Sequence, residues 1–472
     1  MFESAVNVMP AEAVNRLSKL KDLGNREAAR MAATEKRLRL LNDNWKDQVI
    51  DEIRGRVKEE TLKKLRLYVT TKDNPYKKII NRLSQSYIND PSRKFPESTA
   101  TQAEAHGQWY NNNAVSQLMS RAQLYMNATN DLLIYMRRVG TDIEPCILTG
   151  NVVIVIGSEE KPTVPEVVFI RYLENPNDTA TPDNTYWVVW TPAEHFMIDK
   201  NGINRPVGDN SKMINPWGVM PFVYLHRTPP VDYFFDETSG QDLVDLSLNI
   251  GVNDTMDNYS RFYSGFKQGA VIGDFDDPAS GILLDPDNIV AVHGSNVTFQ
   301  VLDWQLDLDA LEEDKRRQKE RTSRNHGVDS GIGEANREKS GIAFAMDSAD
   351  LMELREEQSK ILALAEKEIF KLKLIMEAAM TGRKPTKETL SITFPKPEVY
   401  IAPETELQMQ VEEIAAGLTS KVDVYMKRNQ LTDRTEAIDA LKRIQEENDM
   451  FTDSVIMKEL NSPGPSEEKE PE

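Results

Sequence analysis

The residue types that most often carry enzyme chemistry are scattered along this sequence. Only five histidines occur among 472 residues, and no two stand at the short spacing with which one helix presents a pair of metal ligands. They are His106, His195, His226, His293 and His326. We expect each to be a surface residue or a hydrogen-bonded core residue. The histidines therefore predict neither a metal site nor a catalytic residue.

Sequence motifs of nucleotide-binding proteins and hydrolases are also absent. The chain has no Gly-x-x-x-x-Gly-Lys-Ser/Thr phosphate loop and no Gly-x-Ser-x-Gly nucleophile elbow. Gly331-Ile332-Gly333 begins a glycine pattern, but Asn336 stands where the third glycine of a dinucleotide-binding loop is needed. We therefore predict that the protein is not an enzyme and that it binds no cofactor.

Clustered carboxylates leave one enzymatic alternative open. They are Asp274, Asp276 and Asp277; Asp307 and Asp309; and Glu312 and Glu313. A metal-dependent enzyme acting on nucleic acid needs carboxylates that converge on ions about 4 Å apart. With 76 acidic residues in the chain, clusters in turns are also expected by chance.

Composition indicates a folded protein with more than one subdomain. Hydrophobic residues make up 39% and charged residues 28% of the chain, which is typical of a globular protein. The single cysteine, Cys146, excludes an internal disulfide and a cysteine-rich metal site. No run of about 18 apolar residues predicts a membrane span. Met1–Asn15 lacks the basic and apolar regions of a signal peptide. From the lone cysteine we expect a reducing cytoplasm at the time of folding.

The charge balance argues against a protein that holds nucleic acid tightly. The formal net charge is −19, whereas affinity for nucleic acid comes from lysine and arginine neutralising phosphates. Such a chain can contact DNA through a local basic patch, or without holding it.

Hydrophobic periodicity predicts helices at both ends of the chain and strands between them. Apolar spacings of three and four predict helix over about 11–69 and 103–138. The period changes to two from Pro145 to about Leu225, which predicts strands. Short strands over 390–394 and 399–401 and helices over about 404–460 are expected near the C-terminal end.

Five unlike segments follow one another between Asn215 and Pro385. They are an apolar turn and strand over 215–223, a helix over about 239–267, a β-patterned insert over about 270–301, a charged helix over about 306–324, and a glycine-containing loop over 327–341 that opens into a helix ending near Met380. The last helix has about 40 residues, or about 60 Å at 1.5 Å per residue. Such a series of elements is typical of a structural part that spans a distance, and it is not typical of a catalytic pocket.

The charged helix and the loop after it each allow two interpretations. The helix carries Lys315, Arg316, Lys319, Arg321 and Arg324, and the loop carries Ser330, Asn336, Arg337, Glu338, Lys339 and Ser340. The helix is either an ordinary solvated helix, with charges arranged to suit its dipole, or the lining of a water-filled passage. The loop is either a flexible linker or a mobile loop projecting from the long helix.

The order of these segments resembles that of the portal proteins of tailed bacteriophages, which form the head-to-tail connector. Two short motifs carry the resemblance: Pro216-Trp217-Gly218-Val219-Met220-Pro221 before the first helix, and Ser340-Gly341-Ile342-Ala343 at the start of the long helix. The resemblance implies an α+β, mainly helical subunit that assembles into a ring. It implies a wing over 1–236 (N-terminal helices, then a β-rich part), a first stem helix over 237–268, a clip over 269–304, a second stem helix over 305–326, a tunnel loop over 327–340, a long helix with wing strands over 341–401, crown helices over 402–461 and a disordered acidic tail over 462–472.

The same resemblance implies partners and a location. The ring would have about twelve subunits and sit at one vertex of the capsid in the virion, after assembly in the host cytoplasm. Double-stranded DNA would pass through it without sequence recognition. The terminase large subunit, a head-tail adaptor protein and the major capsid or scaffolding protein would be its other partners. The clip docking surface would include Ile282, Leu283, Leu284, Val290 and Val292. A coiled-coil structural adaptor, suggested by the long helix, is a further alternative.

Overall fold

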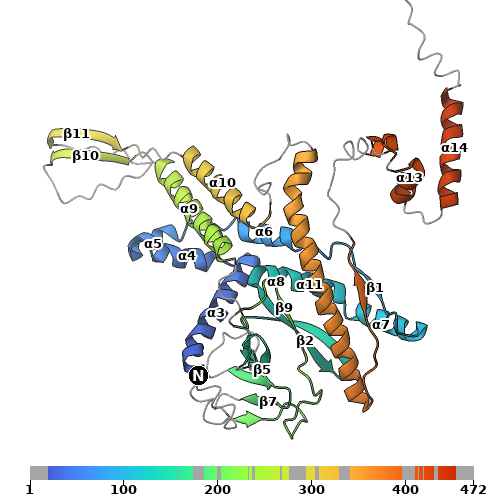
Figure 1. The fold of residues 1–472 in the computed structure, drawn as a ribbon. Coiled ribbons are helices and arrows are strands. Elements are labelled where there is room, and N and C mark those ends of the chain that lie inside the picture. Colours follow the sequence, from blue (N-terminus) through green and yellow to red (C-terminus); the bar gives the residue numbers. More distant parts are fainter. Residues whose placement is uncertain are drawn as a thin grey trace, which may run out of the picture. The chain divides into compact units, whose positions relative to one another are not determined.

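The fold is a mixed α+β arrangement in which helices predominate, as the sequence predicts (Figure 1). The computed structural model describes residues 20–158, 160–173, 185–198, 203–231, 233–235, 240–265, 268–275, 294–302, 308–328, 341–395, 410–412, 414–417, 419–429 and 434–452. The chain divides into two compact units, the larger made of residues 1–338 and 346–397 and the smaller of residues 339–345 and 398–472.

Helices make up the first part of the larger unit. They are α3 (Leu20–Leu41), α4 (Lys46–Arg54), α5 (Glu59–Leu65), α6 (Pro75–Leu83), α7 (Ala100–Asn112) and α8 (Val115–Thr129). The region predicted as helix over about 11–69 is therefore divided, and its first described break comes where Asp43 adopts a positive φ of 57°. Asn74 begins α6, because its side chain accepts a hydrogen bond from the Lys77 N–H at 3.1 Å.

Two antiparallel sheets follow α8. The first has the order β3-β2-β9, formed by Asp142–Thr149, Asp131–Val139 and Phe222–His226. The second has the order β4-β5-β6-β7-β8, formed by Val153–Gly157, Pro165–Leu173, Thr185–Trp190, His195–Ile198 and Asn204–Arg205. These strands confirm the β-rich region that the period of two predicts.

Strand β2 corrects the helix predicted over about 103–138. Asn130 adopts a φ of 68° directly after α8, and the next nine residues form β2, which pairs with β3 over Leu132–Val139 and with β9 over Asp131–Tyr135. Leu133 and Ile134 are both fully buried, in two different hydrophobic clusters. A strand buried on both faces has consecutive apolar residues, and periodicity cannot distinguish it from a buried helix.

The middle of the chain is a pair of helices joined through a β-hairpin. Helix α9 (Gln241–Gly265) precedes strand β10 (Gln268–Phe275), which pairs antiparallel with β11 (Gly294–Leu302). Helix α10 (Leu308–Asn325) follows β11. The predicted helix and charged helix are thus present in this order with two strands of the β-patterned insert between them, whereas residues 276–293 of the insert lie outside the described residues.

Helix α11 (Gly341–Thr381) is 41 residues long, and Gly382 ends it at a φ of 65°. Both features confirm the prediction, because a glycine adopts this left-handed conformation without strain. The buried face of α11 includes Leu362, Ile369 and Met376, which are fully buried against α8 and the β3-β2-β9 sheet. Beyond the helix, β12 (Ser391–Thr393) pairs with β1 (Ser92–Lys94), whereas the strand expected over 399–401 lies outside the described residues.

The smaller unit contains the helices α13 (Lys421–Asn429) and α14 (Arg434–Thr452). The Ser420 hydroxyl accepts a hydrogen bond from the Asp423 N–H at 3.1 Å, and Arg434 pairs with Asp423 at 3.0 Å. These contacts join the start of α13 to the start of α14. In the described part of the chain, no helix is both long enough and apolar enough to span a membrane.

Helix α9 packs closely against α4 at Gly251. A Cβ atom at this position would lie 2.8 Å from the Trp45 ring and 2.8 Å from the Val49 side chain, both fully buried. We expect Gly251→Val to lower the free energy of unfolding by roughly 1–3 kcal/mol, because α4 must move away from α9. Gly107→Ala, with nothing within 4 Å of its Cβ, is the control and should not destabilise the protein. Equal urea midpoints for Gly251→Val and wild type would contradict this packing.

Candidate functional site

Helices α9 and α10 form an antiparallel pair, and charged contacts join them along their length (Figure 1). Arg261 near the end of α9 lies 3.9 Å from Glu312 near the start of α10. At the other end, His326 lies 2.9 Å from Asp242. Because α9 leads into β10 and α10 follows β11, the hairpin is attached at the Arg261 end of the pair.

Lys315 forms the central contact of the pair. Its side chain is only 4% exposed, and Nζ donates hydrogen bonds to Asp254 at 2.9 Å and to Asp257. Burial disfavours the charged ammonium, but the hydrogen bonds to the two carboxylates outweigh this cost and raise the pKa of Lys315. The lysine therefore stays protonated and holds α10 against α9.

Lys319 makes a second inward contact, one turn further along α10. Its ammonium pairs with Asp73 in the segment before α6, and Asp73 also pairs with Lys78 at 2.9 Å. Partial burial would raise the pKa of Asp73, but hydrogen bonds from the two lysines outweigh it and lower that pKa. These contacts attach the helix pair to the α6 region.

The cations proposed to line a passage therefore fall into two groups. Lys315 and Lys319 form ion pairs within the subunit, and their place on a passage wall stays a prediction. Arg316 is exposed but pairs with Glu313 at 2.8 Å. Arg321 and Arg324 are exposed and have no ion-pair partner among the described residues. The sequence could not separate these groups, because all five lie on one short helix and only the position of α9 decides which face is covered.

The other predicted site residues lie outside the described residues. These are the loop residues Ser330, Asn336, Arg337, Glu338, Lys339 and Ser340 and the insert residues Ile282, Leu283, Leu284, Val290 and Val292. Their roles remain predictions.

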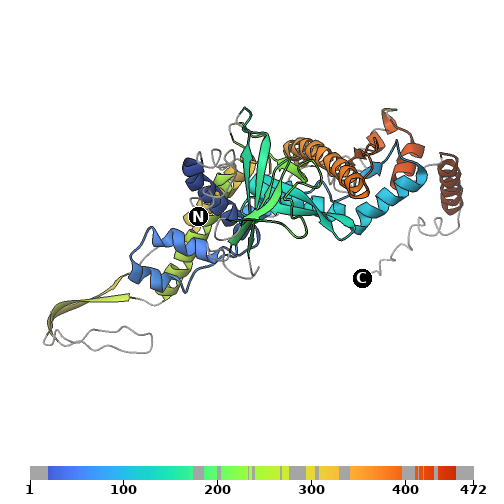
Figure 2. The ribbon, with the colours of Figure 1, turned by 90° about the horizontal axis from the view of Figure 1, so that it is seen from below.

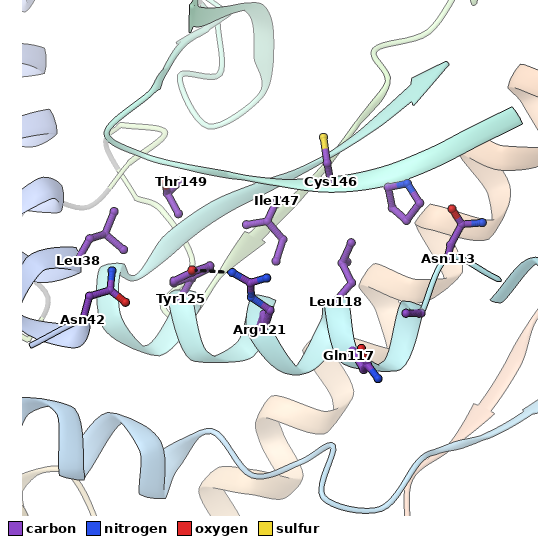
Figure 3. Close-up of a pocket in the computed structure, with 12 residues that line it drawn as sticks. Leu38, Asn42, Asn113, Gln117, Leu118, Arg121, Tyr125, Cys146, Ile147 and Thr149 are labelled. Atoms are coloured by element: carbon purple, nitrogen blue, oxygen red, sulfur yellow. Dashed lines mark hydrogen bonds between the residues drawn. The ribbon is translucent and has the colours of Figure 1, made fainter. Parts of the chain in front are cut away.

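A pocket of about 530 Å³ lies between α8, strand β3 and the end of α3 (Figure 3). Figure 3 shows Ile147 pointing toward Leu118 and Arg121, whereas the Cys146 sulfur points away from them. Burial raises the pKa of the Cys146 thiol, so this cysteine is a poor nucleophile at neutral pH. Arg121 donates a hydrogen bond to the Tyr125 hydroxyl at 3.3 Å. The pocket therefore brings together no nucleophile, general base and oxyanion donor.

Carboxylates do not converge on a metal position in the described part of the chain, which contains no group of three or more His, Cys, Asp or Glu side chains able to hold an ion. The side chains of Asp274, Asp276 and Asp277 and of Asp307 and Asp309 lie outside the residues with described side chains.

A buried polar cluster on α11 is the main feature that sequence reasoning missed. Glu366 is fully buried and receives two hydrogen bonds from Arg93, at 2.7 and 2.8 Å, and one from the Tyr87 hydroxyl at 2.7 Å. Two turns earlier, the buried Gln358 exchanges hydrogen bonds with Asn127 and accepts one from Gln123 at 2.7 Å. These contacts fix the position of α11 along its axis against the rest of the larger unit. The only signal in the sequence was Gln358 within the apolar stripe.

Similar proteins were found among solved structures only, since no protein-family model and no curated protein matches the sequence. A chain of the native gene transfer agent virion is 12% identical, with a TM-score of 0.37, over 78% of this chain and 92% of that one. A chain from the neck of the empty particle, computed with C6 symmetry, is 12% identical, with a TM-score of 0.42, over 79% and 93%. A chain from the neck of the native particle, computed with C12 symmetry, is 11% identical, with a TM-score of 0.38, over 79% and 93%.

The matched chains belong to particle and neck structures. Their likeness to this chain is loose in sequence and in geometry. A functional interpretation therefore has to rest on this chain's own elements and contacts.

Proposed function

We propose that the protein is a portal subunit, which assembles into a ring at one capsid vertex and lets double-stranded DNA pass through its centre. The observation that carries this proposal is the order of elements: an antiparallel helix pair bearing a β-hairpin at its end, followed by a 41-residue helix. This is the order of stem, clip, stem and long helix in the portal family that the sequence resembles. The proposed layout keeps the boundaries given above for wing, stem, clip, tunnel loop, crown and tail.

The contacts within the helix pair suit a stem whose two helices are held firmly together. Lys315 and Lys319 are directed into the subunit, so their charges rigidify the pair instead of facing a ligand. Arg321 and Arg324 remain exposed on α10, together with Arg316. These arginines, with Arg337 and Lys339 of the loop, are the proposed contacts to DNA phosphates.

Weak contact with DNA is what a passage needs. Each phosphate contact adds affinity, and many such contacts would hold the duplex in place. A few exposed arginines on each subunit, in a chain of net charge −19, favour contacts that form and break without reading the bases. DNA binding in this proposal is weak, independent of sequence and sensitive to salt.

The partners in this proposal follow from the place of the hairpin. The β10–β11 module would present the docking surface for the terminase large subunit during packaging and for a head-tail adaptor protein afterwards. The wing would contact the major capsid or scaffolding protein. The protein itself would hydrolyse no nucleotide and would need no metal.

The proposal is tested by whether the purified protein forms a ring. Negative-stain images and light scattering of the purified full-length chain should show a ring of about twelve subunits with a central hole. A protein that remains a monomer at micromolar concentration would contradict the portal function. A closed, solid oligomer without a hole would contradict the channel while leaving oligomerisation intact.

A further inference from the structure

The larger unit carries a basic surface on α5 that its own carboxylates leave unpaired. Lys58, Lys63, Lys64 and Arg66 are exposed and have no ion-pair partner among the described residues, and Leu62 and Leu65 between them are buried. The neighbouring Arg54 and Arg56 differ, because Asp51 and Glu52 pair with them at 2.6 and 2.8 Å. Helix α5 also carries the exposed carboxylates Glu59 and Glu60 in its first turn, so the unpaired cations gather toward its C-terminal end.

Apolar side chains beside these cations indicate a protein partner rather than nucleic acid. Leu67, which directly follows Arg66, is 83% exposed. Phe262 of α9 is 47% exposed, and its ring lies 5.2 Å from that of Tyr68. An exposed leucine adds nothing to phosphate binding, whereas apolar residues surrounded by charges are typical of protein interfaces. The partner surface should therefore be acidic.

The same unit carries an acidic stripe of matching size on α11. Asp350, Glu353 and Glu357 stand at i, i+3 and i+7, which places them on one face of the helix. All three are exposed and have no ion-pair partner among the described residues, unlike Glu356, which lies 3.3 Å from Lys360. The acidic stripe on α11 and the basic surface on α5 are therefore complementary in charge, and every copy of the chain carries both.

Buried residues next to the two charged surfaces belong to one hydrophobic cluster, but the surfaces themselves lie apart. Leu62 and Leu65 of α5 and Leu351 of α11 are buried in the same cluster around α9. In both views of the ribbon, α5 and α11 are separated from each other (Figures 1 and 2). Two unlike surfaces at different places on one subunit can join identical subunits head to tail, as a closed ring requires.

We infer that α5 of one copy of this chain docks on the acidic stripe of α11 of the next copy. The inference rests on the proposed ring and assigns the surfaces through which its subunits meet. Lys63, Lys64 and Arg66 face Asp350, Glu353 and Glu357 across the contact, and Leu67 packs at its centre. Because these are exposed charge pairs, raising the salt concentration weakens the assembly.

Charge reversal on each surface tests this pairing. The first full-length variant carries Lys63→Glu, Lys64→Glu and Arg66→Glu, and the second carries Asp350→Lys, Glu353→Lys and Glu357→Lys. We expect each alone to associate at least about tenfold more weakly than wild type, measured by sedimentation at equal concentration, because like charges then face each other. A 1:1 mixture should recover association to within about threefold of wild type, because each variant then meets opposite charges on both sides.

The matched control reverses three exposed cations after α11, Arg383→Glu, Lys384→Glu and Lys387→Glu, and should associate like wild type. Wild-type association by either test variant, or no recovery in the mixture, would overturn the docking assignment while the ring proposal stands. A monomeric wild type would overturn both. If a reversal variant melts below the wild-type temperature, glutamine at the same three positions replaces it, with a smaller loss expected. Wild-type association by the glutamine variants would equally overturn the assignment.

Discussion

Glu366→Ala is expected to lower the free energy of unfolding by about 3–5 kcal/mol. Glu366 is fully buried in the middle of α11, and Arg93 binds both of its carboxylate oxygens. Without the carboxylate, the Arg93 guanidinium is left largely buried with no counter-charge, and the Tyr87 hydroxyl loses its acceptor. Urea unfolding followed by circular dichroism measures the loss.

Two further variants separate the cost of an unpaired charge from the value of the pair. Tyr87→Phe removes one hydrogen bond and should cost about 1 kcal/mol. Replacing both charged partners, with Glu366→Leu and Arg93→Met, should cost much less than Glu366→Ala, because no charge is then left buried. A loss below about 1 kcal/mol for Glu366→Ala would show that this cluster does not hold α11 in place.

Lys315→Met is expected to lower the free energy of unfolding by about 3 kcal/mol and to loosen α10 from α9. Methionine has a similar length, but it leaves the carboxylates of Asp254 and Asp257 close together without the ammonium between them. Exchange of backbone amide hydrogens in α10 should become faster, because the helix then opens locally. Arg317→Met is the control: its pair with Glu313, at 3.0 Å, is exposed to solvent and should contribute little to stability.

The pH dependence of this contact follows from the direction of the lysine's pKa. The pKa of Lys315 is raised, because its hydrogen bonds to the carboxylates outweigh the cost of burial. Its stabilising contribution is therefore fully present below the ordinary lysine pKa, and it is lost only as the pH rises through the raised value. We expect exchange in wild-type α10, corrected for its intrinsic rate, to be unchanged between about pH 6 and pH 9. Protection that fell within this range would contradict the lysine contact.

Local patterns in the sequence predicted several elements correctly. The 41 residues of α11 carry apolar side chains at steps of three and four, and Gly382 supplies the left-handed conformation that ends the helix. The order of α9, the β-hairpin and α10 was likewise evident from the change of period and from the charges on the second helix. These signals can be recognised in the sequence because backbone geometry and the burial of one face restrict the residue type at each position locally.

Other features of the protein depend on contacts between segments that are distant in the sequence, and only the tertiary structure shows them. Strand β2 was mistaken for helix, because burial on both faces removes the alternation that marks a strand. Lys315 and Arg324 lie on the same helix, and only the packing of α9 separates the inward lysine from the exposed arginine. Glu366 meets Arg93 across 273 positions of sequence, and no local pattern records such a pairing. The sequence by itself thus determined the elements and their order, whereas long-range packing decided which charges stabilise the subunit and which stay exposed to partners.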